Sequence, residues 1–149
     1  MNAIEFLTKD HEAVKALLGA ANTYDQMKAA FAEISRILET HTYLEERFFY
    51  PHFENHEHLG QLIQEAREQH DVAKQLLDGM KHQNGREFEK NFQAIRAALQ
   101  LHMTSKEGEI FPQAERVMDD ATLARLGTEL QTAKIAFEKQ PEAPVMAWR

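Results

Sequence analysis

Two stretches of the chain carry metal-binding side chain types at closely similar spacing. His41 and Glu45 stand one helical turn apart, and His102 is followed in the same way by Glu107; each pair comes shortly before a proline. Imidazole nitrogens and carboxylate oxygens are donors that iron, manganese and zinc accept. Because residues four apart share a helix face, His41 and Glu45 can reach one ion or two neighbouring ions. The repeated motif therefore predicts a metal site.

Two further histidines precede these motifs in matching surroundings. His11 and His70 each lie one helix before a His and carboxylate pair. The chain is therefore an internal repeat of two helix pairs, and two helix pairs close into a four-helix bundle. Such a bundle would bring the four histidines together.

Helical hydrophobic spacing runs through most of the chain and predicts an all-α protein, an up-down-up-down four-helix bundle. The four histidines and Glu45 interrupt the apolar stripes, so they are expected to face the core. A fifth stripe from Leu123 to Phe137 predicts an additional C-terminal helix, packed across one end of the bundle or used for association. The domain is expected over residues 1–139, followed by a flexible tail, 140–149, that contains Trp148.

The second carboxylate depends on the local geometry of the fourth helix. Strict helical spacing after His102 places Lys106 inside, and lysine is a poor core residue. One wide turn, of a kind that clusters at functional sites, would place Glu107 inside and bring Phe111 back into phase. Glu107 is therefore the expected ligand, with Glu109 as the alternative.

The buried polar set favours ligation over a plain core role. A lone histidine on an apolar face is more often a core residue held by hydrogen bonds. Four imidazoles and two carboxylates buried without counter-charge would instead cost several kcal/mol per unpaired ion, comparable to the whole stability of a domain. Two divalent cations would remove this cost.

Composition narrows the possible functions. The chain has 149 residues and a net charge of -7, which argues against binding to nucleic acid or to anionic membranes. It has no cysteine, which excludes zinc-thiolate sites and iron–sulfur clusters. Neither a basic leader nor a membrane-length apolar run occurs, so a soluble cytoplasmic protein of one domain is expected.

The paired motifs resemble the hemerythrin-like, His-His-Glu (HHE) cation-binding family of four-helix bundles, from about Met1 to Pro112. The resemblance implies a non-haem centre of two iron ions, bridged by oxo or hydroxo groups and by carboxylates, that meets oxygen, nitric oxide or peroxide. The ligands carried over are His11, His41, Glu45, His70, His102 and Glu107.

The chain departs from the oxygen-carrying hemerythrins at Lys74, where a second histidine of the third helix is expected. One iron should therefore be less fully ligated. Tyr50 is a candidate to complete the iron ligands if Pro51 disturbs the helix enough to turn it inward, and an aromatic that closes the end of the bundle otherwise. Glu46 is an alternate ligand or an acceptor that fixes a histidine tautomer.

An incompletely ligated iron favours reactivity over reversible oxygen carriage. The expected partner is a diatomic molecule or peroxide, and the expected chemistry is catalase-like peroxide decomposition in a stress response; enzymatic turnover itself stays an open question. The alternatives are oxygen or iron sensing or storage without turnover, and a metal-free helical interaction module. Either a monomer or a homodimer fits the fifth helix.

Overall fold

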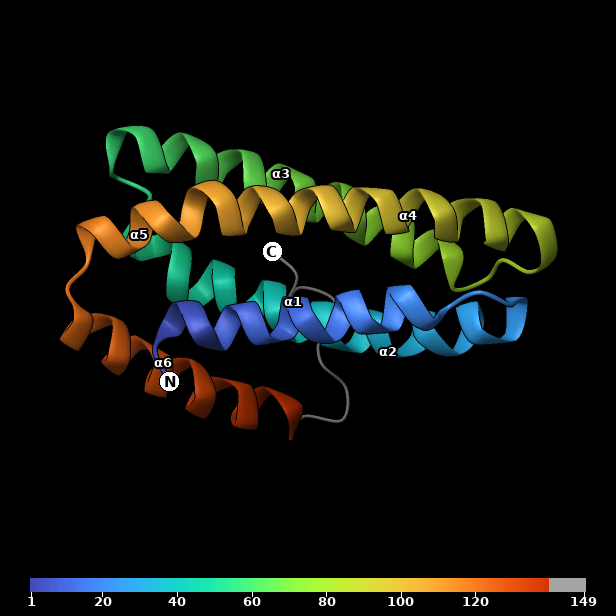
Figure 1. The fold of residues 1–149 in the computed structure, drawn as a ribbon, viewed down its shortest axis with the longest axis horizontal. Coiled ribbons are helices and arrows are strands. Elements are labelled where there is room, and N and C mark those ends of the chain that lie inside the picture. The colour runs from blue at the N-terminus through green and yellow to red at the C-terminus, as the bar shows by residue number, and fades with distance from the viewer. Residues whose placement is uncertain (140–149) are drawn as a thin grey trace.

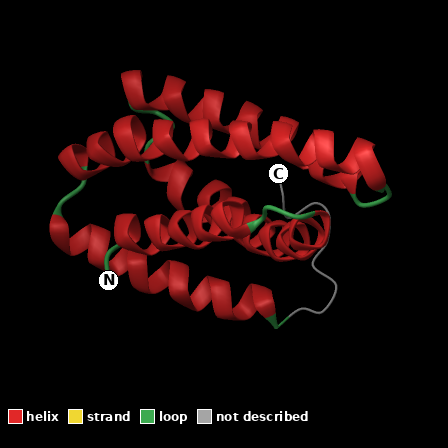
Figure 2. Ribbon diagram, turned by 45° about the vertical axis from the view of Figure 1, so that its right-hand side comes forward, coloured by secondary structure: helices red, strands yellow, loops and turns green. Residues whose placement is uncertain are grey.

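The computed structural model describes residues 1–139, and all regular structure within this range is helical (Figures 1 and 2). Four long helices form the predicted bundle, with neighbours along the chain running antiparallel. They are α1 (Ala3–Ala20), α2 (Tyr24–Leu44), α3 (Glu57–Met80) and α4 (Gly85–Ser105). The predicted all-α fold is confirmed. The predicted tail, with Trp148, lies outside the described residues.

Local sequence signals set where the helices begin. Asn2 and Glu5 form a reciprocal capping box at the start of α1, and Thr23 and Gln26 form another at the start of α2. Gly85 has a φ of 59°, a left-handed conformation that glycine adopts without strain, and it turns the chain from α3 into α4. These signals mark where α1, α2 and α4 begin and so help to set the height of their histidines in the bundle.

Both His-bearing second helices of the repeat continue through a wide π turn. Helix α2 leads into η1 (Glu45–Phe49) and a short 3-10 turn, η2 (Tyr50–His52), while α4 leads into η3 (Lys106–Ile110) and α5 (Phe111–Val117). Each π turn is followed by a proline, whose ring cannot donate a hydrogen bond and would crowd the preceding helical turn. The sequence predicted one wide turn, in the second copy, and the structure has one in each copy.

The additional helix, α6 (Asp120–Glu138), lies along the outside of α1 and α2 rather than across an end of the bundle (Figure 1). Asp119 caps it by accepting a hydrogen bond from the backbone N–H of Thr122. Gly127 allows α6 to lie close to the N-terminal backbone, because a Cβ at this position would stand 2.3 Å from the backbone oxygen of Met1. None of the described helices is long and apolar enough to cross a bilayer.

The apolar core is divided into two clusters along the bundle. One cluster surrounds Leu7, Phe49 and Ile63, and the other surrounds Ile34 and Phe92. The histidines lie where one cluster gives way to the other; on α1, for example, His11 falls between Leu7 and Val14. The fold thus encloses a polar layer between two apolar ones.

Candidate metal centre

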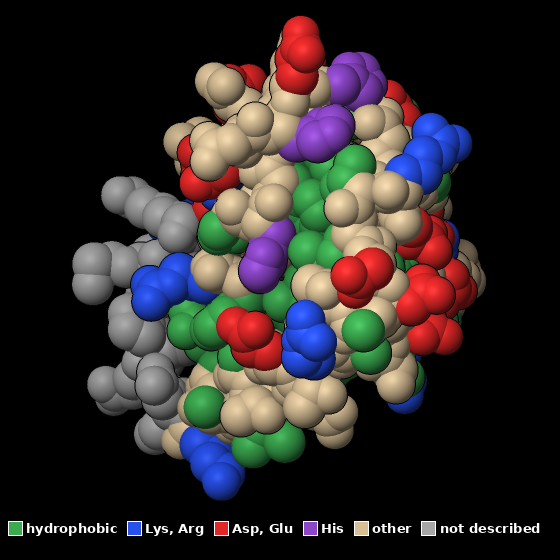
Figure 3. Space-filling model, turned by 90° about the vertical axis from the view of Figure 1, so that its left-hand side faces the viewer, with side chains coloured by type: hydrophobic (Ala, Val, Ile, Leu, Met, Phe, Trp, Pro, Cys, Tyr) green, Lys and Arg blue, Asp and Glu red, His purple; other side chains and the backbone are tan. Residues whose placement is uncertain are grey.

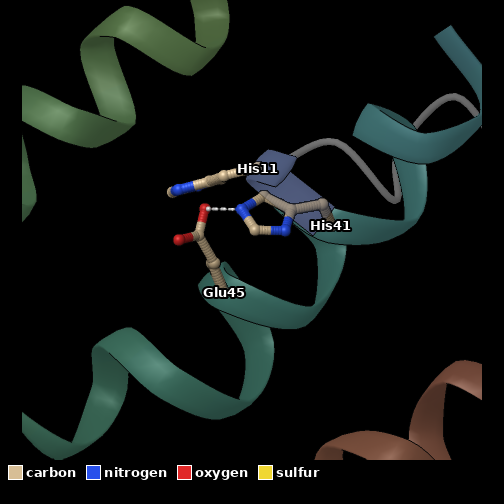
Figure 4. A group of neighbouring side chains, drawn as sticks. All are labelled: His11, His41 and Glu45. Carbon is tan, nitrogen blue, oxygen red and sulfur yellow. Dashed lines mark ion pairs between the residues drawn. The ribbon is translucent and has the colours of Figure 1, made fainter. Parts of the chain in front are cut away.

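Three buried side chains from the first copy of the repeat converge in this polar layer. One potential ligand atom from each of His11, His41 and Glu45 lies within 4.8 Å of the others (Figure 4). All three side chains are at most 2% exposed. His41 Nε2 is 3.2 Å from Glu45 Oε1, as expected for side chains one turn apart. Among the described residues, this is the group of histidines and acids that can hold a cation.

The second copy brings two more histidines to the same carboxylate. His70 Nε2 lies 3.3 Å from Glu45 Oε1, and the rings of His70 and His102 are 5.1 Å apart, edge to face. On the other side of the layer, the rings of His11 and His41 are 4.9 Å apart. The four predicted histidines therefore lie together around Glu45.

Lys106, not Glu107, projects into the centre from the fourth helix. Its ammonium lies 2.5 Å from Glu45 Oε1 and 3.0 Å from His70 Nε2, and the side chain is 2% exposed. The predicted wide turn exists, but it begins at Lys106, so Lys106 keeps the helical phase of His102. The phase changes only after Lys106. The structure thus corrects the expected position of Glu107.

Glu107 lies at the edge of the centre, behind a histidine. Its Oε2 is 3.2 Å from Nδ1 of His11 and 2.9 Å from the ammonium of Lys15, and its side chain is 27% exposed. The alternative ligand, Glu109, is exposed and accepts a hydrogen bond from the hydroxyl of Ser105. Neither carboxylate joins Glu45 in the centre.

All four histidines are held through Nδ1. An acidic or amide oxygen lies beside each Nδ1 atom, in a position to accept its proton. The pairs are His41 with Asp10 at 2.9 Å, His70 with Glu46 at 2.9 Å, His11 with Glu107 at 3.2 Å, and His102 with Gln69. This arrangement favours a proton on Nδ1 and directs Nε2 toward the centre, the orientation that metal-binding histidines require.

Sequence reasoning overlooked Asp10 and Gln69 and left the role of Glu46 open. The structure gives Glu46 the second of its two expected roles, that of an acceptor behind a histidine. A usable signal was present, because Asp10 and Gln69 each stand directly before a histidine of the repeat. A comparison of the residues that precede the equivalent histidines in the two copies would have identified both.

The buried polar atoms of the centre that lack hydrogen bonds indicate whether a cation would fit there. Within residues 1–139, four buried polar atoms of the centre have no hydrogen-bond partner. They are His41 Nε2, His102 Nε2, Glu45 Oε2 and the hydroxyl oxygen of Tyr50. Buried polar atoms are rarely left unpaired, and a cation would satisfy the nitrogen and oxygen donors among them. The donor set therefore fits a metal ion.

Tyr50 faces inward because of the π turn before it. Its backbone N–H donates to the carbonyl oxygen of Glu45, five residues earlier, which advances the phase by one residue relative to a regular helix. The side chain is fully buried, with its ring stacked at 5.9 Å on that of His70. Tyr50 thus fills the core and also turns its hydroxyl toward the polar layer.

Burial and neighbouring charges move the pKa values in opposite directions. Desolvation, with His41 and Lys106 nearby, lowers the pKa of His11 to about 2, and desolvation with Lys106 and His70 does the same for His102. Burial opposes ionisation of Glu45 as well, but His41 and Lys106 outweigh it and hold the pKa of that carboxyl well below its usual value. The metal-free centre therefore contains an ionised carboxylate and neutral imidazoles at His11 and His102.

A match to a known family agrees with this geometry. Residues 2–114 match the hemerythrin HHE cation-binding domain. The chain belongs to this family. No curated protein and no solved structure gives a significant match. The hemerythrin match covers α1 to α4 and the turns that carry the centre, so it includes every candidate ligand and ends before α6.

Other histidines of this hemerythrin domain lie on the surface. Figure 3 shows histidine side chains exposed at one end of the molecule. Exposed histidines occur from the end of η2 to the first turn of α3, at His52, His56 and His58. They form no group of three with acids among the residues that the structure describes. The family's cation-binding property therefore points to the buried centre.

Pockets approach the centre from the side of α3 and α4. A small pocket of about 10 Å³, room for one water-sized molecule, is lined by His102 and Lys106. A larger, mostly apolar groove of about 470 Å³ shares Gln69 and His102 with it. A small molecule arriving on this side would meet the second copy of the repeat first.

Proposed function

We propose that this hemerythrin-family protein binds iron in the polar layer and that the iron-loaded protein binds or reacts with oxygen, peroxide or nitric oxide. The observation that carries the proposal is the common orientation of the four histidines of the centre, each held at Nδ1 with Nε2 inward. Nitrogen and carboxylate donors without sulfur suit iron and manganese. Iron bound there would supply redox chemistry.

The proposed ligands of the ion are His11, His41 and Glu45, whose donor atoms lie within 4.8 Å of one another. Glu45 Oε2 and His41 Nε2 are buried without hydrogen bonds, so binding an ion breaks none there. Three protein ligands leave further coordination positions for a small molecule. The sequence expectation of two iron ions requires a second carboxylate, and Lys106 stands in its place.

The remaining polar groups of the centre are proposed to act on the small molecule. Lys106 places a positive charge and hydrogen-bond donors beside Glu45, where they would stabilise negative charge on a reduced oxygen species. Tyr50 remains a proposed ligand, because its buried hydroxyl has no hydrogen-bond partner among the described residues. Ferric protein should then show a visible phenolate-to-iron absorption band that Tyr50→Phe removes.

The direct test is iron content together with peroxide chemistry. Wild-type protein should retain iron after anaerobic loading and gel filtration and should release oxygen from peroxide. His41→Ala should lose the iron and the activity, while the exposed control His52→Ala should keep both. Failure of wild-type protein to retain any metal would favour the metal-free interaction module. Retained iron without oxygen release would remove the catalase-like activity alone.

A second candidate function is reversible binding or sensing of iron or oxygen without turnover. The ion pair between Lys106 and Glu45 favours it, because the carboxylate is compensated even when no ion is bound. Iron uptake and release should then be reversible with the fold intact. Repeated loading and chelation, followed by circular dichroism, would show this; unfolding on chelation would count against it.

A further inference from the structure

We propose that the ammonium of Lys106 takes the place of a second metal ion, so that the centre holds one cation per chain. This inference rests on the proposed metal binding. It concerns how many ions the centre accepts, and it departs from the two-ion centre expected from sequence.

The two copies of the repeat place Glu45 and Lys106 at equivalent positions. Each stands four residues after the second histidine of its copy, and each is the first residue of a π turn. The two side chains meet across the centre at 2.5 Å. The first copy therefore offers two histidines and a carboxylate, whereas the second offers two histidines and an ammonium.

The ammonium occupies the donor atoms that a second ion would need. It lies 3.0 Å from His70 Nε2, so the lone pair of that nitrogen accepts from lysine. It also contacts Glu45 Oε1, the oxygen that lies between His70 Nε2 at 3.3 Å and His41 Nε2 at 3.2 Å. An ion bound to His70 Nε2 at the usual 2.0–2.2 Å would stand close to a like charge in a buried site.

The first-copy ligands are not blocked in the same way. Glu45 keeps its second oxygen, Oε2, without a partner, and Nε2 of His41 has no hydrogen bond. His11 stands on their side of the centre, with its ring 4.9 Å from that of His41. One ion on these three residues can therefore coexist with Lys106 on the remaining oxygen of Glu45.

The nearest surrounding charges do not supply a replacement carboxylate. Glu46 is engaged with Nδ1 of His70, and Glu107 is engaged with Lys15 and Nδ1 of His11. Asp10 is held against Nδ1 of His41 and lies 3.7 Å from the ammonium of Lys134. Each of these acids faces the outer nitrogen of an imidazole, so none of the three joins Glu45 on the inner side of the centre.

The experiment counts ions and asks whether they are coupled. Wild-type protein and the variants Lys106→Glu and Lys106→Gln are loaded with Mn(II), desalted and measured by elemental analysis and electron paramagnetic resonance. Wild type should bind one Mn(II) per chain with the six-line spectrum of an isolated ion. Lys106→Glu should bind two, with a broadened spectrum from a coupled pair. Lys106→Gln, which removes the charge without adding a carboxylate, should still bind one.

The wild-type count is decisive even if a variant fails to fold. Two ions per wild-type chain would overturn this inference and leave the proposed metal binding intact. No bound ion, with no shift in melting temperature on adding Mn(II), would overturn the proposed metal binding and this inference with it. A folded Lys106→Glu protein that binds only one ion would also contradict the role given to lysine.

Discussion

Each of the four histidines of the centre uses its two ring nitrogens for different purposes. The outer nitrogen, Nδ1, meets an acceptor, and the inner nitrogen, Nε2, faces the polar layer. Three of the four acceptors are carboxylates, which make the imidazole a better donor to a cation than an amide would. Asp10 and Glu46 should therefore tune metal affinity although neither is a proposed ligand.

Asp10→Asn should weaken cation binding by roughly 10- to 100-fold, because it removes the charge behind His41 and leaves the fold in place. Isothermal titration with Mn(II) measures the effect. Glu12→Gln, an exposed change two residues away, is the matched control and should leave the affinity unchanged. Equal affinities for Asp10→Asn and wild type would show that Asp10 does not influence the ligand.

The stability of the metal-free protein should fall as the pH drops below about 6.5. His11 and His102 have folded-state pKa values lowered to about 2, so the unfolded chain binds two protons that the folded chain does not. Their contribution is complete above the unfolded pKa and is lost as the pH falls, with a slope of at most about 2.7 kcal/mol per pH unit. Urea unfolding between pH 7 and pH 4.5 measures it.

His102→Gln should reduce this slope by about half, since one of the two protons is removed. Exposed His82→Gln should not change it. A free energy of unfolding that stays constant from pH 7 to pH 5 would show that the imidazoles of His11 and His102 are not held neutral.

At the scale of elements, the two π turns decide which side chains enter the centre. Each begins just after the histidine-bearing turn, so Glu45 and Lys106 keep helical phase and everything beyond them is shifted. The shift turns Tyr50 and Phe111 into the core. Hydrophobic spacing indicated that a shift was needed in the second copy, but it could not show whether the shift came before or after Lys106.

Docking of α6 depends on close backbone contact, and Gly127→Ala should disturb it. The added methyl group would stand 2.3 Å from the backbone oxygen of Met1, which requires the helix or the N-terminus to move. Overpacking of this kind costs about 1–3 kcal/mol, measurable as a lower melting temperature. Gly19→Ala, which meets no atom within 4 Å, is the control and should be neutral or stabilising by up to about 1 kcal/mol.

At the scale of the whole molecule, the polar layer separates two apolar clusters and carries its own counter-charge. The sequence suggested that burying these groups without cations would be too costly. Lys106 changes that balance, because it compensates Glu45 inside the core while His11 and His102 stay neutral. We therefore expect a protein that folds without metal, unlike small domains whose folding requires a bound ion.

Chelator-treated protein should consequently keep a cooperative unfolding transition by circular dichroism. Lys106→Met should lower the free energy of unfolding of the metal-free protein by up to about 3–5 kcal/mol, because it leaves buried Glu45 without its lysine counter-charge and with only the neighbouring imidazoles. The double variant Lys106→Met with Glu45→Gln removes both charges and should recover most of the loss. A metal-free wild-type protein without a cooperative transition would contradict this balance.

The sequence predicted most of the fold and the four histidines, since both depend on periodic patterns that survive in any regular helix. The match between copies also located Glu45. The error at Glu107 had a specific cause: lysine was judged unfit for the core, whereas here it has a buried partner that lies far away in the sequence. Contacts between copies, such as those of Lys106 with Glu45 and His70, have no signature in spacing alone.

Differences between the two copies also make the two sides of the centre chemically unequal. Where the first copy has Asp10, Glu45 and Tyr50, the second has Gln69, Lys106 and Phe111, so at these three equivalent positions the first copy alone supplies acidic and phenolic oxygens. The pockets open beside the second copy, both at His102 and the smaller one also at Lys106. A visiting molecule on this side would therefore pass the carboxylates of Glu65 and Glu68 and then the ammonium of Lys106 before it reached the cation, so a small neutral visitor would meet the least electrostatic opposition.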